Sequence, residues 1–166
     1  MPIKIAITTD QPHDVTKRRW GSFTKIGNRA AADYWQTKFL PRHFARAAHG
    51  RYRYQDRRRQ YRKKKRYYGR VGKAKKGGRV AQVWTGLMER MFRRRHMIKA
   101  YPTRFTIHMI GPRYISMRPK DPRKPWKAAE IMTVLADEER AMGRIWKAAV
   151  QRQVDRFRAR RTKKVT

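Results

Sequence analysis

A long basic segment, residues 42–79, constrains the fold of this chain more than any other feature. It holds 17 Lys or Arg residues and a single acid, Asp56, so its net charge is +16. Like charges at this density repel one another across the turns of a helix and within a compact state. We therefore interpret residues 50–79 as a projecting basic arm or loop that becomes ordered on a partner, and residues 159–166 as a basic tail.

The composition of the whole chain points to a folded protein that works next to negative charge. Lys and Arg outnumber Asp and Glu by 46 to 11, and the net charge of +35 needs a counter-charge, which disfavours a free metabolic enzyme. Hydrophobic residues make up 39% of the chain and aromatic residues 11%, more than a disordered basic tail would carry. The length of 166 residues predicts a single domain.

Several classes of protein are excluded by what the sequence lacks. It contains no cysteine, which rules out disulfides, thiolate metal sites, iron–sulfur clusters and cysteine nucleophiles. The apolar run in the first ten residues is too short for a signal peptide, and no stretch approaches the roughly 20 apolar residues of a membrane span. We expect a soluble chain that is not exported by those routes.

Alternating apolar residues predict a small sheet. Ile3, Ile5 and Ile7 alternate with polar or small residues, and Phe105, Ile107 and Met109 give the strongest strand pattern in the chain. Two further short strands are predicted over residues 80–84 and 128–135.

Helical spacing appears in three places. Asn28 is predicted to cap a helix that runs to about residue 48, with a kink at Pro41. Residues 85–92 indicate a turn into a short helix. Asp137, Glu138 and Glu139 favour a helix start, and the apolar residues that follow form a stripe expected to lie across the sheet: Met142, Ile145, Trp146, Ala149, Val150, Val154 and Phe157. Together these elements predict an α+β domain with a small, mostly antiparallel sheet, a kinked N-terminal helix and a long C-terminal helix.

The sequence shows no pattern typical of an active site. The histidines have no metal-ligand spacing, and no carboxylate pair suggests acid–base chemistry. His108 is interpreted as a packed or hydrogen-bonded imidazole. The glycines between 72 and 78 lack the order of a phosphate-binding P-loop. We therefore expect no enzyme activity, no metal and no cofactor.

The basic segment is instead predicted to bind a negatively charged partner. Tyrosines are interleaved with its cations, which combines phosphate-neutralising charge with planar faces that can stack on bases or take a guanidinium. Because no sequence-reading motif is present, the partner is either a nucleic-acid backbone or an acidic protein surface. The alternative is that these charges are simply solvated, keep the protein soluble and bind no partner. The residues predicted to make these contacts are Arg51, Arg53, Arg57, Arg58, Arg59, Arg62, Lys63, Lys64, Lys65, Arg66, Lys73, Lys75 and Lys76.

The order of features along residues 28–158 resembles the small neck and tail-completion proteins of tailed bacteriophages. The resemblance rests on the helix that ends near Phe39–Phe44, the basic run, a hydrophobic–x–Thr–Gly–Leu turn at Thr85, Gly86 and Leu87, and the helix led by Asp137. It implies a virion structural protein of the head–tail junction, assembled in the host cytoplasm as a ring. Its partners would be portal, adaptor or tail-tube subunits, and double-stranded DNA in the bore.

Two other classes of function compete with this resemblance. A ribosomal or other RNA-associated protein fits the high isoelectric point and the Lys/Arg/Gly-rich extension, although the five Trp and eight Met weigh against it. A nuclease does not fit, because metal-assisted phosphodiester cleavage needs clustered carboxylates.

Overall fold

The computed structural model describes most of the chain outside the basic segment. The described residues are 2–6, 10–45, 47–54, 87–94, 96–111 and 127–163. They divide into two compact units, one made of residues 36–96 and 109–135, and the other of residues 2–35, 97–108 and 136–166. The strand predicted over 80–84 lies outside the described residues.

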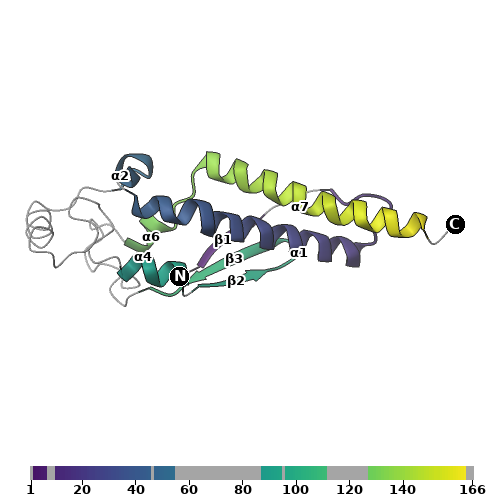
Figure 1. The fold of residues 1–166 in the computed structure, drawn as a ribbon, viewed down its shortest axis with the longest axis horizontal. Helices are drawn as coiled ribbons and strands as arrows, with labels where there is room; N and C mark the ends of the chain where they lie inside the picture. Colours follow the sequence, from purple (N-terminus) through teal and green to yellow (C-terminus); the bar gives the residue numbers. More distant parts are fainter. Residues whose placement is uncertain are drawn as a thin grey trace, which may run out of the picture. The chain divides into compact units, whose positions relative to one another are not determined.

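A three-stranded antiparallel sheet confirms the α+β class (Figure 1). The strands β1 (Pro2–Ala6), β2 (His96–Ala100) and β3 (Arg104–Met109) stand in the order β1-β3-β2. Strand β1 runs antiparallel to β3 with Ile5 opposite Phe105, so both strands predicted from alternation are confirmed. Strand β2 was not predicted, and a tight turn joins it to β3, in which the Tyr101 amide donates to the Arg104 carbonyl at 2.8 Å.

Two long helices, α1 (Lys17–Tyr34) and α7 (Ala136–Thr162), pack along one another in antiparallel directions. Near one end of the pair Phe23 lies against Phe157, and further along Gly27 lies against Val150 and Trp146. Helix α7 begins just before the acidic triplet at 137–139, as predicted. Its apolar stripe is confirmed as its inner face, but that face packs on α1 and not on the sheet as we expected.

Helix α1 also contacts the turn between β2 and β3. A Cβ at Gly21 would lie 3.6 Å from Pro102, and the buried Asn28 amide donates to the Tyr101 carbonyl at 2.6 Å. The prediction that Asn28 begins a helix is therefore wrong: Asn28 lies inside α1, eleven residues after its start at Lys17. The buried Asn28 side chain thereby joins α1 to the backbone of the turn, at the Tyr101 and Pro102 carbonyls.

After α1 the chain changes helix type, which confirms the predicted kink. A π-helical turn, η1 (Trp35–Phe39), leads into a 3₁₀ turn, η2 (Leu40–Phe44), whose second residue is Pro41. Proline has no amide hydrogen to donate and its ring crowds the preceding turn, so the α-helix cannot continue through it. Short helices follow: α2 (Ala48–Arg51), α4 (Leu87–Arg94) and α6 (Lys127–Ile131).

Helix α6 corrects the predicted strand over 128–135. Residues 127–131 are helical, and residues 132–135 form a turn and an irregular connection to α7. Ala128, Ala129 and Glu130 are strong helix formers, which outweighs the β-propensity of the apolar residues further along. None of the helices in the described ranges is both long enough and apolar enough to cross a membrane.

Candidate polyanion-binding groove

Most of the residues predicted to bind a partner lie outside the described ranges. This holds for all of them between Arg57 and Lys76. Of the structural turn predicted at Thr85, Gly86 and Leu87, the first two residues also lie outside the described ranges, and Leu87 begins α4. Arg51 ends α2 and Arg53 follows two residues later, and both side chains are exposed. Their contact with a partner stays a prediction.

Two of the tyrosines expected to offer stacking faces are instead part of the core. Tyr52 and Tyr54 are buried, at 4% and 3% exposure, and pack with Ala48 and Leu135. Tyr52 stacks on the His43 ring at a centroid distance of 3.8 Å, and the Tyr54 hydroxyl is hydrogen-bonded to His43 Nδ1. The prediction that these two tyrosines stack on bases is wrong, because alternation with Arg in 51–54 places the rings inside and the charges outside. The alternative, that a ring takes a guanidinium, is confirmed at Tyr52, which has the Arg51 guanidinium 5.8 Å from its centroid.

Burial also fixes the charge of His43. Desolvation lowers the pKa of its imidazole from 6.5 to about 3, and the positive charge of Arg51 adds to the effect. His43 is therefore neutral at physiological pH. Its role is to hold the two tyrosines, and it carries no charge toward a ligand.

A groove lies between the start of α1 and the end of α7. Its volume is about 940 Å³, and both helices contribute side chains to it. It brings together residues that are more than 130 positions apart in the chain. The lining residues are Asp14, Thr16, Arg19, Phe23, Gln153, Arg156, Phe157, Arg160, Arg161 and Lys163.

Two phenylalanines give this groove an apolar floor. Phe23 and Phe157 are both half-buried and lie at a tilt of 57°, with ring centroids 6.2 Å apart. The Arg19 guanidinium lies over the Phe157 ring, 4.6 Å from its centroid. This contact restrains a cation at the groove while its N–H donors, which lie in the plane of the guanidinium, stay available.

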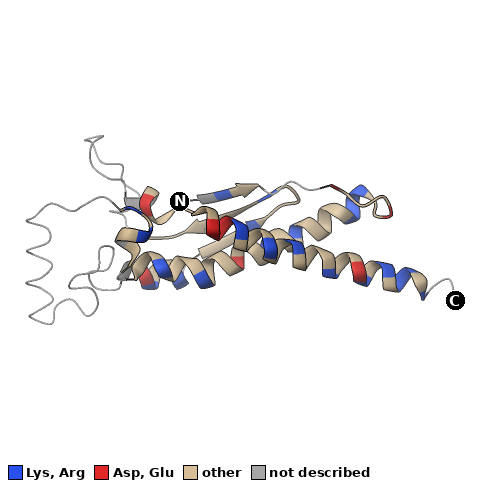
Figure 2. Cartoon of the chain, turned by 90° about the horizontal axis from the view of Figure 1, so that it is seen from above, with Lys and Arg blue, Asp and Glu red and all other residues tan. Residues whose placement is uncertain are grey.

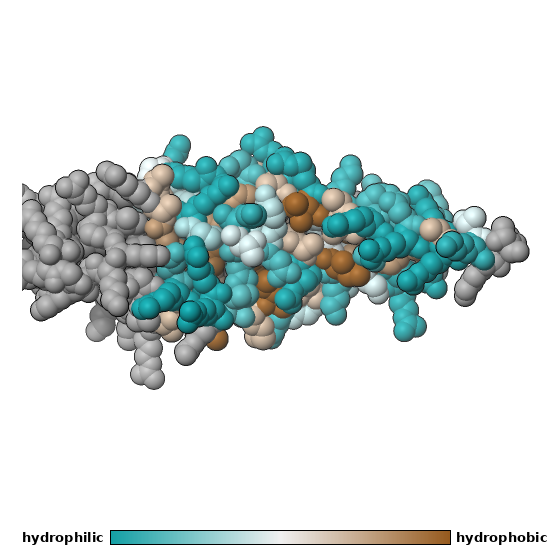
Figure 3. Space-filling model, viewed as in Figure 1, coloured by the Kyte–Doolittle hydropathy of each residue, from teal (hydrophilic) through white to brown (hydrophobic). Residues whose placement is uncertain are grey.

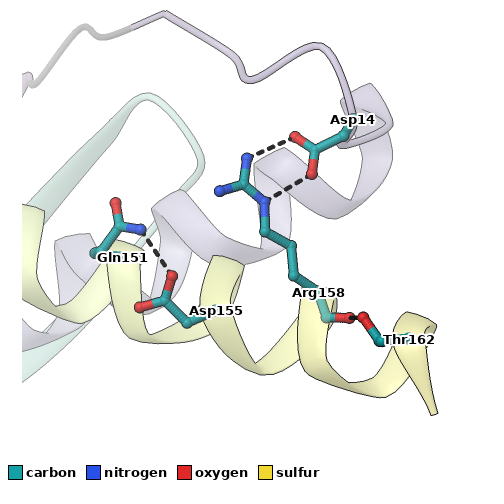
Figure 4. A network of polar contacts seen from close by, with 5 residues as sticks. All are labelled: Asp14, Gln151, Asp155, Arg158 and Thr162. Carbon is teal, nitrogen blue, oxygen red and sulfur yellow. Dashed lines mark hydrogen bonds and ion pairs between the residues drawn. The ribbon is translucent and has the colours of Figure 1, made fainter.

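The single acid in the groove is already paired. Arg158 donates to Asp14 through Nε at 2.8 Å and Nη2 at 3.0 Å, a two-point ion pair between α7 and the residues just before α1 (Figure 4). This hydrogen bonding lowers the pKa of the Asp14 carboxyl below its usual value. On α7, the side-chain amide of Gln151 donates one hydrogen bond to the Asp155 carboxylate at 2.8 Å.

Five cations in the groove are left without such a partner. Within the described part of the chain, no carboxylate forms an ion pair with Arg19, Arg156, Arg160, Arg161 or Lys163. Most of the described surface seen in Figure 3 is hydrophilic, and Figure 2 shows Lys and Arg recurring along both helices. The groove therefore combines concentrated positive charge with an apolar floor.

Sequence reasoning placed no site here. It interpreted residues 159–166 as a basic tail, whereas residues 159–162 belong to α7. The basic residues there complement the partial negative charge of the helix C-terminus. The spacing of Arg156 and Arg160, four residues apart, puts both on one face and was a usable signal. Arg19 and Phe23 could be added only once the pairing of α1 with α7 was known.

Comparisons with known proteins leave this groove to be interpreted from its own geometry. The chain matches no protein-family model, no curated protein and no solved structure. In the described ranges, no three His, Cys, Asp or Glu side chains come together in a way that could hold a metal ion. The chemistry that the groove offers is thus the binding of negative charge.

Proposed function

We propose that this chain is a non-catalytic structural subunit that assembles by electrostatic docking, as a neck or tail-completion protein of a tailed phage. The observation that supports this most is the groove in which five cations form no ion pair with a carboxylate of the described chain. Together with the net charge of +16 over residues 42–79, it gives the subunit two separate sources of positive charge that need a counter-charge.

Ring assembly makes the charge argument stronger. A closed ring repeats every subunit's charge around one axis, so a subunit of +35 is tolerable only beside DNA in the bore or beside acidic neighbours. In this role the helical pair α1/α7 is a rigid carrier for groove cations, and the basic segment supplies contacts that do not depend on base sequence. The virion neck is the proposed location.

An RNA-associated structural protein is the second candidate, and the composition of residues 42–79 favours it. Lys, Arg and Gly dominate that segment, and phosphate contacts from such a segment serve RNA as well as DNA. The two candidates differ in assembly: the phage role needs a ring of identical subunits, and the RNA-associated role needs none.

Electron microscopy of nuclease-treated protein, combined with sedimentation velocity, tests the proposal. We expect closed rings of uniform size, formed by the protein alone or on addition of short duplex DNA. A monomer that sediments unchanged with duplex DNA, yet binds structured RNA, would overturn the phage role and support the RNA-associated one.

A further inference from the structure

We infer that the groove between α1 and α7 binds an acidic peptide segment of a partner protein, one that also carries an apolar side chain. This inference deepens the proposed function, since it names the kind of partner that docks at that site. It rests on three features of the groove: its size, its floor and its cations.

The size of the groove fits one chain segment and not a double helix. Ligand pockets of about 300–1,000 Å³ enclose molecules of drug size, and this groove has about 940 Å³. That volume holds a few side chains of an extended or helical peptide. Duplex DNA, whose major groove alone is about 12 Å wide, contacts surfaces and does not enter a space of this kind.

The floor favours a protein side chain over a nucleobase. A base needs an open aromatic face on which to stack, but Arg19 already lies over Phe157 and Phe23 packs at a tilt beside the same ring. An aliphatic or aromatic side chain can instead fill the half-buried apolar space between the helices. Phosphate groups alone gain nothing from such a floor.

The cations suit carboxylates. Asp14 shows how a carboxylate is held at this site, by two parallel N–H donors of Arg158. Arg156, Arg160 and Arg161 offer the same planar fork of donors, which matches a carboxylate at two points. A peptide with acidic residues on both sides of an apolar one would therefore satisfy the rim and the floor together.

A site-resolved crosslinking experiment tests the inference on the full chain, after nuclease treatment. The probe is a fluorescein-labelled peptide of glutamates with one central benzoylphenylalanine, which crosslinks to nearby side chains on illumination. Mass spectrometry then maps the crosslinks. We expect them on the groove helices, within residues 14–23 and 153–163, and not mainly on the basic segment.

Matched charge variants complete the test. Arg160→Gln with Arg161→Gln should reduce groove crosslinking about tenfold, because two charge-assisted contacts are lost. Arg140→Gln with Arg144→Gln removes the same charge from exposed positions of α7 outside the groove and should change it less than twofold. Arg156→Gln with Lys163→Gln is a second groove pair, in case the first pair alters the fold. Thermal melts of each variant check that the fold is kept.

Three outcomes would overturn the inference. One is crosslinking that maps outside the groove, and another is an equal loss in the groove and control variants. The third is displacement of the peptide by a single-stranded oligonucleotide of the same net charge at equal concentration. If the protein forms rings but no peptide crosslinks in the groove, this inference is wrong and the proposed function is still supported. Peptide crosslinked in the groove of a protein that forms no rings would support this inference and overturn the proposed function.

Discussion

Gly27 of α1 packs directly against Val150 of α7: a Cβ at position 27 would lie 2.6 Å from Val150 Cγ2. The same Cβ would be 2.9 Å from Trp146 Nε1. Real side chains do not approach that closely, so the two helices can meet here because residue 27 has none. This contact sets the spacing of the helices that carry the groove.

Replacing Gly27 with alanine should therefore destabilise the protein. Alanine favours a helix by about 1 kcal/mol over glycine, but overpacking at a helix contact costs about 1–3 kcal/mol, and we expect a net loss in the free energy of unfolding. Urea denaturation measures it. Gly143→Ala in α7 is the control, because its Cβ would meet nothing within 4 Å and should stabilise the helix. Equal stabilisation by both variants would contradict the packing described.

Asn28 should matter for the attachment of α1 to the sheet. Its side-chain amide is fully buried and donates to the Tyr101 carbonyl at 2.6 Å and the Pro102 carbonyl at 3.3 Å. Asn28→Ala leaves those carbonyls without this donor, and we expect a loss of about 1–3 kcal/mol in unfolding free energy. Lys25→Ala, at an exposed position of the same helix, should stay within about 0.5 kcal/mol of the parent. If the two variants lose the same stability, Asn28 does not anchor the turn.

Acid should weaken the protein through His43. The folded state lowers the pKa of this imidazole to about 3 from 6.5, so below pH 6.5 the unfolded state binds more protons than the folded state. The contribution of His43 to the free energy of unfolding is therefore complete above pH 6.5 and is lost as the pH falls toward 3. The loss is at most about 1.4 kcal/mol for each pH unit.

Urea midpoints measured across this pH range would show the slope. The variant His43→Phe should flatten it, since the group that titrates is gone, whereas His13→Gln at an exposed position should not. A slope that survives His43→Phe would assign the acid sensitivity to other groups.

The sequence predicted those elements that are determined by residues close together in the chain. Alternation identified β1 and β3, the acidic triplet before residue 140 located the start of α7, and Pro41 ended the helix before it. The start of α1 was missed because Gly21, Ser22 and Thr24 weaken helix propensity over its first turns, while long-range contacts at Gly21 and Asn28 stabilise it. Strand β2 was missed because its apolar residues do not alternate: Met97 and Ile98 are adjacent, and Met97 is exposed while Ile98 is buried.

The groove could not be predicted for a related reason. Its cations come from Arg19 at the start of α1 and from residues 156–163 at the end of α7, and only antiparallel pairing brings them together. The sequence pointed to the most conspicuous run of charge, residues 42–79, and the cations from residue 159 onward were interpreted as a basic tail. A charge cluster formed by tertiary contact has no signature within any one window of sequence.

The salt dependence of duplex DNA binding tests the central claim, that the positive surplus of this chain is neutralised by a polyanion. With ten phosphate contacts, the logarithm of the association constant should fall with the logarithm of salt concentration at a slope of about −9. Replacing Arg62, Lys63, Lys64, Lys65 and Arg66 with Gln should make that slope shallower by about 4.5, with no change in the melting temperature. A slope near zero for the parent protein, or one that these five replacements leave unchanged, would contradict the account.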